Sequence, residues 1–300
     1  MSGEPFAART FAVELRLPGS DEPLCQAAFR ECEGLELRRA IADVHEGGDE
    51  RSVRLLPGHE SFGNVTLRRG MTAAFDLWLW WEQGVRATCD VVVLSPDLTA
   101  ERVRFRLHGC LPVRVAGPRL DAMTSDLAIE TLELACERIE VLRPGAPPPP
   151  APQALVKAQL RELDARFERE INRARSVAVQ INPHELRTSF AHEPTPRTQL
   201  DLRLIFDVRA PTATGRAAPD DVRRLTAKVA YFATPRPARG GALARPAVRL
   251  VWGTFQFDGH LEALEETLDA FSPDGRPLRA ALALSLVQTH IAPYAFAGQT

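Results

Sequence analysis

Pro144-Gly145-Ala146-Pro147-Pro148-Pro149-Pro150-Ala151-Pro152 is a segment in which six of nine residues are proline. Proline lacks a backbone N–H and has a fixed φ, so this segment can join neither a central sheet ladder nor a helix interior. It is expected to form an extended polyproline II spacer of roughly 28 Å. The sequence therefore predicts two domains, 1–143 and 154–300, joined by a linker at 144–153.

On both sides of this segment the composition is that of a globular protein. The 300 residues are 45% hydrophobic, 25% charged and 7% aromatic, which excludes a mainly disordered, collagen-like or coiled-coil chain. No 18 apolar residues run together, and residues 1–10 lack the pattern of a signal peptide. Neither a membrane span nor conventional export is expected.

The two halves of the chain carry small net charges of opposite sign. Residues 1–150 carry a net charge of −6 and residues 151–300 a net charge of +4, which is too weak for a nucleic-acid binder with a basic face. Lys157 and Lys228 are the only lysines, so a phosphate-binding loop ending in Gly-Lys-Ser/Thr is excluded. Nucleic acid and nucleotides are therefore not expected as partners.

Short alternating segments indicate a mainly β protein in the first domain. One helix is predicted at 72–83, capped by Thr72, with Phe75, Trp78 and Leu79 at helical spacing and Gly84 ending it. The predicted strands are 11–17, 35–43, 65–67, 89–94, 102–107, 111–115 and 127–138. Strands at such intervals favour a β-sandwich or β-barrel.

The second domain shows the same mixture of strands and a single clear helix. The strand candidates are 155–163, 176–180, 200–208 and 248–257, and the helix is 220–230. Residues 261–271 are ambiguous, because Leu261, Leu264, Leu268 and Phe271 fit a helical period while turn residues flank the segment. Periodicity alone leaves strand and helix open here.

Motifs for enzyme chemistry are missing from the sequence. His45-Glu46 and His59-Glu60 lack the second histidine of a helical zinc site, and neither a Gly-x-Ser-x-Gly elbow nor a Gly-x-Gly-x-x-Gly loop occurs. The carboxylate pairs Glu31/Glu33 and Glu265/Glu266 lie in charged surroundings typical of solvated faces. No catalytic residue, cofactor or metal site is predicted, and the five cysteines are interpreted as small buried hydrophobic residues.

Three tryptophans lie close together in the predicted helix. Trp78 and Trp81 fall on one side of it, and Trp80 points elsewhere. We expect two of these side chains to pack on the sheet. The third is a candidate partner surface.

Several separate motifs of the first domain, taken together, resemble those of one known protein family. In chain order they are Glu46-Gly47-Gly48, Leu56-Pro57-Gly58, residues 62–70 (FGNVTLRRG), Trp78, Leu111-Pro112-Val113, Gly117-Pro118 and residues 129–135 (IETLELA). This set resembles the tail tube protein family of contractile phages and extracellular contractile injection systems, and it spans nearly the whole domain. Cys110 and Cys136 depart from the residues that are commoner there, with little expected effect on the fold.

The second domain resembles another family of the same machines, the tube-like adapter between spike and tube. The motifs are Leu155-Val156-Lys157-Ala158, residues 179–183 (VQINP), 200–207 (LDLRLIFD), 251–259 (VWGTFQFDG) and 271–280 (FSPDGRPLRA). As structural family positions we single out Asn182, Pro183, Trp252, Gly253, Asp274 and Gly275. The resemblance implies that 261–271 is a strand entering a hairpin. It also implies that the LysM module common in such adapters is not part of 154–300.

Together the resemblances imply two tandem tail-tube-like β-barrel or sandwich domains and a structural, non-enzymatic protein. Such domains form homo-oligomeric rings, which removes exposed sheet edges. Six chains would form two stacked rings of six domains, the arrangement we favour. Three chains, with pseudo-sixfold symmetry, would form one ring of six alternating domains.

The expected partners are copies of the chain itself and the tail tube, spike or hub, and baseplate proteins. Assembly is expected in the cytoplasm, followed by incorporation into a phage tail-like particle. The loop containing Glu46, Gly47, Gly48, Leu56, Pro57 and Gly58 is the candidate for stacking contacts between rings. The alternative function is a cargo- or effector-loading factor that uses tube-like domains to act at the tube lumen. A hydrolase acting on the cell envelope would require a site that the sequence does not show.

Overall fold

The computed structural model describes most of the chain as two compact units, residues 1–151 (unit 1) and 152–300 (unit 2). The described residues are 10–20, 22–25, 29–44, 53–123, 127–145, 155–172, 175–192, 196–210, 220–237, 243–288 and 295–296. Most of the predicted linker, 144–153, lies outside them, so its extended form stays a prediction. Each unit is described by itself.

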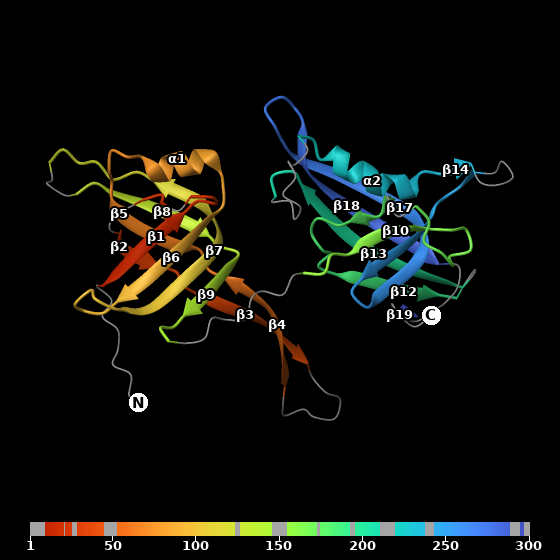
Figure 1. The fold of residues 1–300 in the computed structure, drawn as a ribbon, viewed down its shortest axis with the longest axis horizontal. Helices are drawn as coiled ribbons and strands as arrows, with labels where there is room; N and C mark the ends of the chain where they lie inside the picture. The colour runs from red at the N-terminus through yellow and green to blue at the C-terminus, as the bar shows by residue number, and fades with distance from the viewer. Residues whose placement is uncertain are drawn as a thin grey trace. The chain divides into compact units, whose positions relative to one another are not determined.

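Unit 1 is a β structure with one short helix, shown in Figure 1. Its elements are β1 (Phe11–Arg16), β2 (Phe29–Glu33), β3 (Leu37–Val44), β4 (Arg54–Phe62), β5 (Val65–Gly70), α1 (Asp76–Gln83), β6 (Ala87–Leu94), β7 (Glu101–Ala116), β8 (Ile129–Ala135) and β9 (Arg138–Leu142). The main sheet has the order β1-β6-β7-β8-β5-β2, with β9 pairing β7. Because β1 and β2 are not paired with each other in the described chain, the sheet is folded over and open. The barrel alternative in its closed form is therefore wrong.

The long strand β7 bends this sheet. It pairs with β6 and β9 before Gly109 and with β8 after it, and the register shifts at that point. Gly109 has φ 63°, and a Cβ there would lie 2.6 Å from the Glu137 carboxylate. Glycine is the residue that adopts this conformation without steric cost, so it allows the bend. The two predicted strands 102–107 and 111–115 are thus one strand with a bulge.

The described residues of unit 2 form a sheet of eight strands, a separate two-stranded β14–β15 sheet and one helix. Its elements are β10 (Gln159–Leu163), β11 (Val177–Ala178), β12 (Leu186–Ala191), β13 (Arg197–Asp207), α2 (Arg223–Ala233), β14 (Arg236–Pro237), β15 (Leu243–Ala244), β16 (Ala247–Trp252), β17 (Phe255–Phe271), β18 (Pro277–Gln288) and β19 (Ala295–Phe296). The sheet order is β11-β10-β16-β17-β18-β13-β12, with β19 pairing β17.

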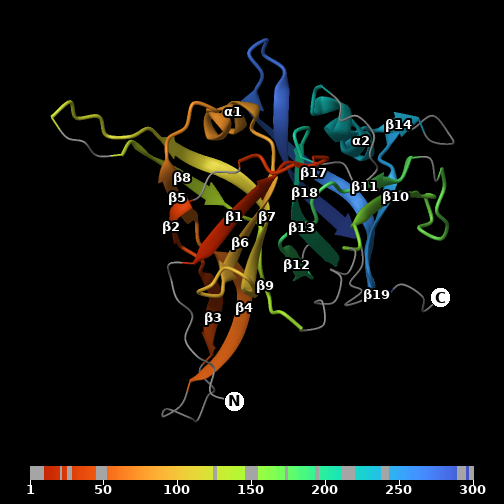
Figure 2. The ribbon, with the colours of Figure 1, turned by 60° about the vertical axis from the view of Figure 1, so that its left-hand side comes forward.

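The two units share one topology. In each sheet the first strand of the unit is followed by three consecutive strands from the part of the chain after the helix, β6 to β8 in unit 1 and β16 to β18 in unit 2, and then by the strand that precedes the helix. This gives β1-β6-β7-β8-β5-β2 in unit 1 and β10-β16-β17-β18-β13-β12 in unit 2. Helix α1 contacts β7, and α2 contacts the equivalent β17; Figures 1 and 2 show each helix lying over its own sheet. Unit 1 adds the β3–β4 hairpin between β2 and β5 and the strand β9, whereas unit 2 adds β11, the β14–β15 pair and β19.

The ambiguous segment 261–271 is a strand, as the resemblance implied, and lies in β17. Its helical spacing has a structural cause. The register with β18 shifts once, between Leu261 and Ala263. This bulge adds one residue to β17, so the step from Leu261 to Leu264 is three residues long instead of two. One bulge thus accounts for the first step of the apparent helical period.

A buried ion-pair network fixes α1 to the sheet of unit 1. The Arg69 side chain is 1% exposed; its Nε donates to Glu130 Oε1 at 2.8 Å, and its terminal nitrogens donate to the Asp76 carboxylate. Trp78 Nε1 donates to Glu130 Oε2 at 3.2 Å. Burial opposes the charge of Arg69, but the hydrogen bonds with Asp76 and Glu130 outweigh it and raise its pKa. The network therefore joins β5, β8 and the first turn of the helix.

This network also corrects the predicted helix start. Helix α1 begins at Asp76, with Phe75 as the N-cap in left-handed conformation, so Thr72 is not its cap. Asp76 Oδ1 accepts the Leu77 N–H at 2.9 Å, which satisfies one of the free donors of the first turn. The buried positions are Leu77 and Trp80 rather than the predicted Phe75 and Leu79, which are exposed. The predicted end at Gly84 is confirmed.

A second ion-pair cluster lies on the sheet formed by β1, β6 and β7. The Asp90 side chain, 1% exposed, accepts from Arg106 at 2.9 Å and from Arg104 at 2.7 Å. Burial alone would raise the pKa of Asp90, but these hydrogen bonds outweigh it and hold the pKa below its usual value. The ionised form of Asp90 is thus the one that the fold stabilises.

Replacing Arg69 by methionine should lower the free energy of unfolding of unit 1 by about 3–5 kcal/mol, because Glu130 and Asp76 would lose a buried partner. Three of the four tryptophans lie on α1, so denaturant unfolding followed by tryptophan fluorescence reports mainly on unit 1. Arg68→Met is the matched control, since the Arg68–Glu31 pair is solvent-exposed and should contribute at most about 1 kcal/mol. Equal losses in the two variants would contradict the role given to the buried network.

The lowered pKa of Asp90 predicts that the unfolding free energy of unit 1 depends on pH in the acidic range. Its pKa is lower in the folded than in the unfolded state, so its stabilisation is complete above the unfolded value of about 3.9 and is lost as the pH falls through the folded pKa. Asp90→Asn should be less stable than the parent at neutral pH. The difference between the two should shrink on acidification below about pH 4. Urea unfolding of the parent and of Asp90→Asn at several pH values measures this difference in stability. A difference that stays constant with pH would contradict the stabilising role of the ionised Asp90 carboxylate.

Candidate assembly surfaces

The β3–β4 hairpin stands apart from the main sheet of unit 1. It forms a two-stranded sheet of its own, and Figure 1 shows it extending away from the rest of unit 1. All eight residues of β3 are exposed, as are eight of the nine in β4. An isolated two-stranded hairpin is at best marginally stable in water, so a hairpin with both faces exposed is typical of a segment that packs on a partner.

One face of the hairpin is largely apolar. Side chains two apart in a strand share a face, which places Leu37, Arg39, Ile41 and Asp43 together. Directly opposite residues complete this face with Phe62, Glu60, Pro57 and Leu55. Leu37, Ile41 and Leu55 are each more than half exposed. The Arg39 guanidinium pairs with the Glu60 carboxylate across the strands.

The predicted stacking loop corresponds to this hairpin and its tip. Glu46, Gly47 and Gly48 lie outside the described residues. Leu56, Pro57 and Gly58 lie within strand β4 rather than in a loop. A Cβ on Gly58 would lie 3.1 Å from the Ala40 carbonyl oxygen, beside the register shift of the two strands. A contact role of these six residues stays a prediction.

The three tryptophans of α1 have different environments. Trp80 is fully buried, and its Nε1 donates to the Val85 carbonyl at 2.7 Å. Trp78 is partly buried against Glu130, and Trp81 is 46% exposed. Two indoles thus contact the body of unit 1 and one faces outward. Trp81 is therefore the member of this group that remains a candidate partner surface.

Asn182 and Trp252 act together on one backbone segment of unit 2. Asn182 Nδ2 donates to the Val156 carbonyl at 2.8 Å, and its Oδ1 accepts the Ala158 N–H at 3.0 Å. Trp252 Nε1 donates to the same Val156 carbonyl at 3.0 Å. The Asn182 amide thus replaces a strand partner for the segment that enters β10. Pro183, the next residue, is buried.

The other selected positions of unit 2 lie in turns. Gly253, with φ 59°, is in the turn between β16 and β17. Asp274 and Gly275 form the turn between β17 and β18, where Gly275 has φ 80° and Asp274 accepts from Ser272 Oγ at 2.6 Å. Glycine supplies the positive φ that both turns require. These residues shape the hairpins of unit 2.

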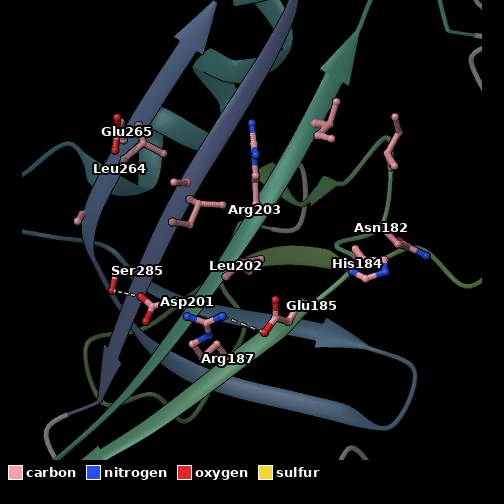
Figure 3. A pocket seen from close by; sticks show the side chains of 15 residues that line it. Asn182, His184, Glu185, Arg187, Asp201, Leu202, Arg203, Leu264, Glu265 and Ser285 are labelled. Atoms are coloured by element: carbon pink, nitrogen blue, oxygen red, sulfur yellow. Dashed lines mark hydrogen bonds and ion pairs between the residues drawn. The ribbon is translucent and has the colours of Figure 1, made fainter. Parts of the chain in front are cut away.

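A hollow of about 800 Å³ opens on the sheet face of unit 2 over β12, β13, β18 and β17. Figure 3 shows its side chains projecting from neighbouring strands. Its polar members include Asp201, which accepts from Ser285 at 2.7 Å, and the Glu185–Arg187 pair at 3.2 Å. Exposed Ile181 and Ile205 add apolar surface.

Burial raises the pKa of all five cysteine thiols above the usual value. Burial raises the pKa of Cys25 and Cys32 to about 11 and that of Cys110 to about 12. All five are free thiols, and Cys25, Cys89 and Cys110 are buried. Among the described residues no group of three or more His, Cys, Asp or Glu side chains could hold a metal ion. No helix in the same part of the chain is long and apolar enough to cross a membrane.

The family comparisons divide the chain as the two units do. Residues 7–140 match the model of the T4-like virus tail tube protein gp19, and residues 187–294 match that of the contractile injection system tube protein. Each unit thus matches the model of a tube protein family. No curated protein matches the sequence significantly.

Three solved structures illustrate what parts of this chain are similar to. A chain of the anti-feeding prophage baseplate is 24% identical, with 48% of this chain and 99% of that chain covered and a TM-score of 0.44. A chain of the extracellular contractile injection system PVC, from its extended sheath–tube complex, is 19% identical, with 47% and 94% covered and a TM-score of 0.40. Hcp1 of Flavobacterium johnsoniae is 14% identical, with 43% and 94% covered and a TM-score of 0.28.

The stability of unit 2 should depend on both polar atoms of the Asn182 amide. Asn182→Asp keeps the acceptor for Ala158 but places a carboxylate against the Val156 carbonyl, so unit 2 should lose about 1–3 kcal/mol of unfolding free energy. Asn64→Asp is the control, because the Asn64 amide donates to Glu133 on the exposed surface of unit 1. Chemical denaturation of the full chain measures both variants. An unchanged unit 2 transition in Asn182→Asp would contradict the bridging role.

Proposed function

We propose that the chain is a structural, non-enzymatic subunit of a contractile injection system, at the base of the inner tube or as the adapter between spike hub and tube. The observation that carries this proposal is the match of each half to a tube protein family. The two open sheets and the exposed β3–β4 hairpin support it, since both features suit a chain whose surfaces are completed by neighbours.

The proposed assembly is a homo-oligomeric ring. An open antiparallel sheet ends in unpaired backbone donors and acceptors, and closure into a ring satisfies them. We favour six chains, with each type of unit forming its own ring and the 144–153 segment acting as spacer. Three chains with alternating units form the alternative, which the common strand order of the units would accommodate. Native mass spectrometry of the assembled protein distinguishes these stoichiometries.

The proposed partners are other proteins of the same phage tail-like particle. The chain would assemble in the cytoplasm with itself and then contact the tail tube, the spike or hub, and baseplate proteins. Deleting its gene should therefore leave particles without a tube or with an unassembled sheath, as seen by electron microscopy. Tubes of normal length that lack only their cargo would instead indicate a loading factor.

Ile41→Asp should abolish or strongly weaken ring formation while leaving the unfolding of unit 1 unchanged, because Ile41 is 60% exposed on the free-standing hairpin. Leu120→Asp is the matched control, since Leu120 is also an exposed apolar residue of unit 1 but lies outside the hairpin. Native mass spectrometry and particle incorporation measure the effect. Normal assembly of Ile41→Asp would contradict the role of the hairpin.

A further inference from the structure

We propose that the hollow of unit 2 receives the β3–β4 hairpin of a second copy of this chain. The inference rests on the proposed function in taking the hairpin as an assembly contact, and it adds the surface that the hairpin occupies. Its basis is the fit between two exposed surfaces of the same sequence, one projecting and one hollowed.

Small side chains on β18 form the floor of the hollow. The strand register places Arg203, Ala283 and Glu265 in one row across β13, β18 and β17. The next row holds Asp201, Ser285 and Ala263. Because β18 contributes only alanine and serine to these rows, the sheet face is lower along β18 than along β13 and β17.

Opposite charges stand on the two sides of this floor. In Figure 3 Arg203 projects from β13 and Glu265 from β17, with β18 between them. Both are exposed, and neither has an ion-pair or hydrogen-bond partner among the residues that the structure describes. Two strand spacings separate the outer strands by about 9.5 Å. The hollow thus combines an apolar floor with a free cation on one side and a free anion on the other.

One face of the β3–β4 hairpin has a row of side chains complementary to the row Arg203, Ala283 and Glu265 in the hollow. Arg39, Ile41 and Asp43 alternate along one face of β3, so an apolar side chain is flanked by a cation and an anion. Arg39 and Asp43 are about 13 Å apart along the strand, a separation that long side chains bring within reach of the outer strands of the hollow. With Ile41 on Ala283, Asp43 faces Arg203 and Arg39 faces Glu265. Asp43 also lacks a partner among the described residues, whereas Arg39 already pairs with Glu60.

The equivalent face of unit 1 does not offer this fit. There the Arg68 side chain pairs with Glu31 at 2.5 Å, and Asn64 donates to Glu133 at 2.8 Å, so the corresponding strands β2, β5 and β8 are covered by paired polar groups. Among the described residues, unit 1 thus provides the free-standing β3–β4 hairpin and unit 2 provides the hollow. A projecting and a receiving surface on different parts of one chain produce head-to-tail contacts, which close into rings or continue as stacks.

Filling the hollow is the first test. Ala283 is exposed, so Ala283→Trp should fold normally but weaken self-association of the full chain at least about tenfold, because the indole occupies the hairpin position. Ala227→Trp on the exposed face of α2 is the matched control and should associate like the parent. Sedimentation velocity over a concentration series measures both. Association of Ala283→Trp equal to that of the control would overturn the proposal.

Charge reversal tests the pairing itself. Asp43→Arg should weaken self-association by facing Arg203 with a like charge, and so should Arg203→Asp alone. The double variant Asp43→Arg/Arg203→Asp should restore association toward that of the parent at low salt. Failure of the double variant to recover would overturn the pairing of these two residues.

A cysteine pair identifies the occupant. Ile41→Cys and Ala283→Cys in one chain should form a disulfide between copies, seen as dimers and higher oligomers on a non-reducing gel and absent from either single variant. A disulfide confined to monomers would place the hairpin on its own chain and overturn the proposal. If all hollow variants still form rings and enter particles, the proposed function stands and this contact fails. If the parent chain neither associates nor enters particles, both fail.

Discussion

The bend of the central strand determines the architecture of both units. In unit 1, β7 leaves β6 and joins β8 at Gly109, and in unit 2, β17 leaves β16 and joins β18 near Leu261. Each bulge turns one antiparallel sheet over a single core, with buried residues such as Leu107 and Leu261 beside the bend. A sheet folded in this way encloses a core without closing, so its outermost strands keep unpaired edges. In the described residues the fold thus leaves sheet edges unpaired as a consequence of how it forms its core.

The sequence predicted the elements whose patterns are local. The alternation of 102–107 and the helix end at Gly84 needed no tertiary information, and the structure contains both. Strand β4 was missed because its Pro57 and Gly58 have the composition of a turn. Strand β18 was missed because its buried leucines alternate with alanine, which is also apolar, so the contrast between its two faces is weak. The hollow could not be predicted, since it depends on which strands pair across β18. The fit of hairpin and hollow is therefore visible only once the registers are known.

The common topology of the units is kept by packing and not by sequence. A row of charged side chains crosses three neighbouring strands of each sheet. These are Glu14, Asp90 and Arg106 on β1, β6 and β7 in unit 1, and Arg161, Arg249 and Asp258 on β10, β16 and β17 in unit 2. The signs are reversed, yet in each row the middle residue pairs with its neighbour on the bent strand. In both units the charge of the middle residue is thus neutralised by an ion pair with the neighbouring strand. Either sign pattern achieves it, which explains how strongly the two halves differ while their strand order is the same.

Perturbed pKa values often mark catalytic sites. The causes of the shifts at Asp90 and Arg69 instead indicate that these two groups have a structural role. The pKa of Asp90 is lowered by hydrogen bonds from Arg106 and Arg104 against the effect of burial, and that of Arg69 is raised by Asp76 and Glu130 in the same way. In each case the shift favours the charge that the group already carries at neutral pH. A general acid or base needs the opposite, a pKa brought toward neutrality. These groups therefore hold strands and a helix in place, as a protein that acts by assembly requires.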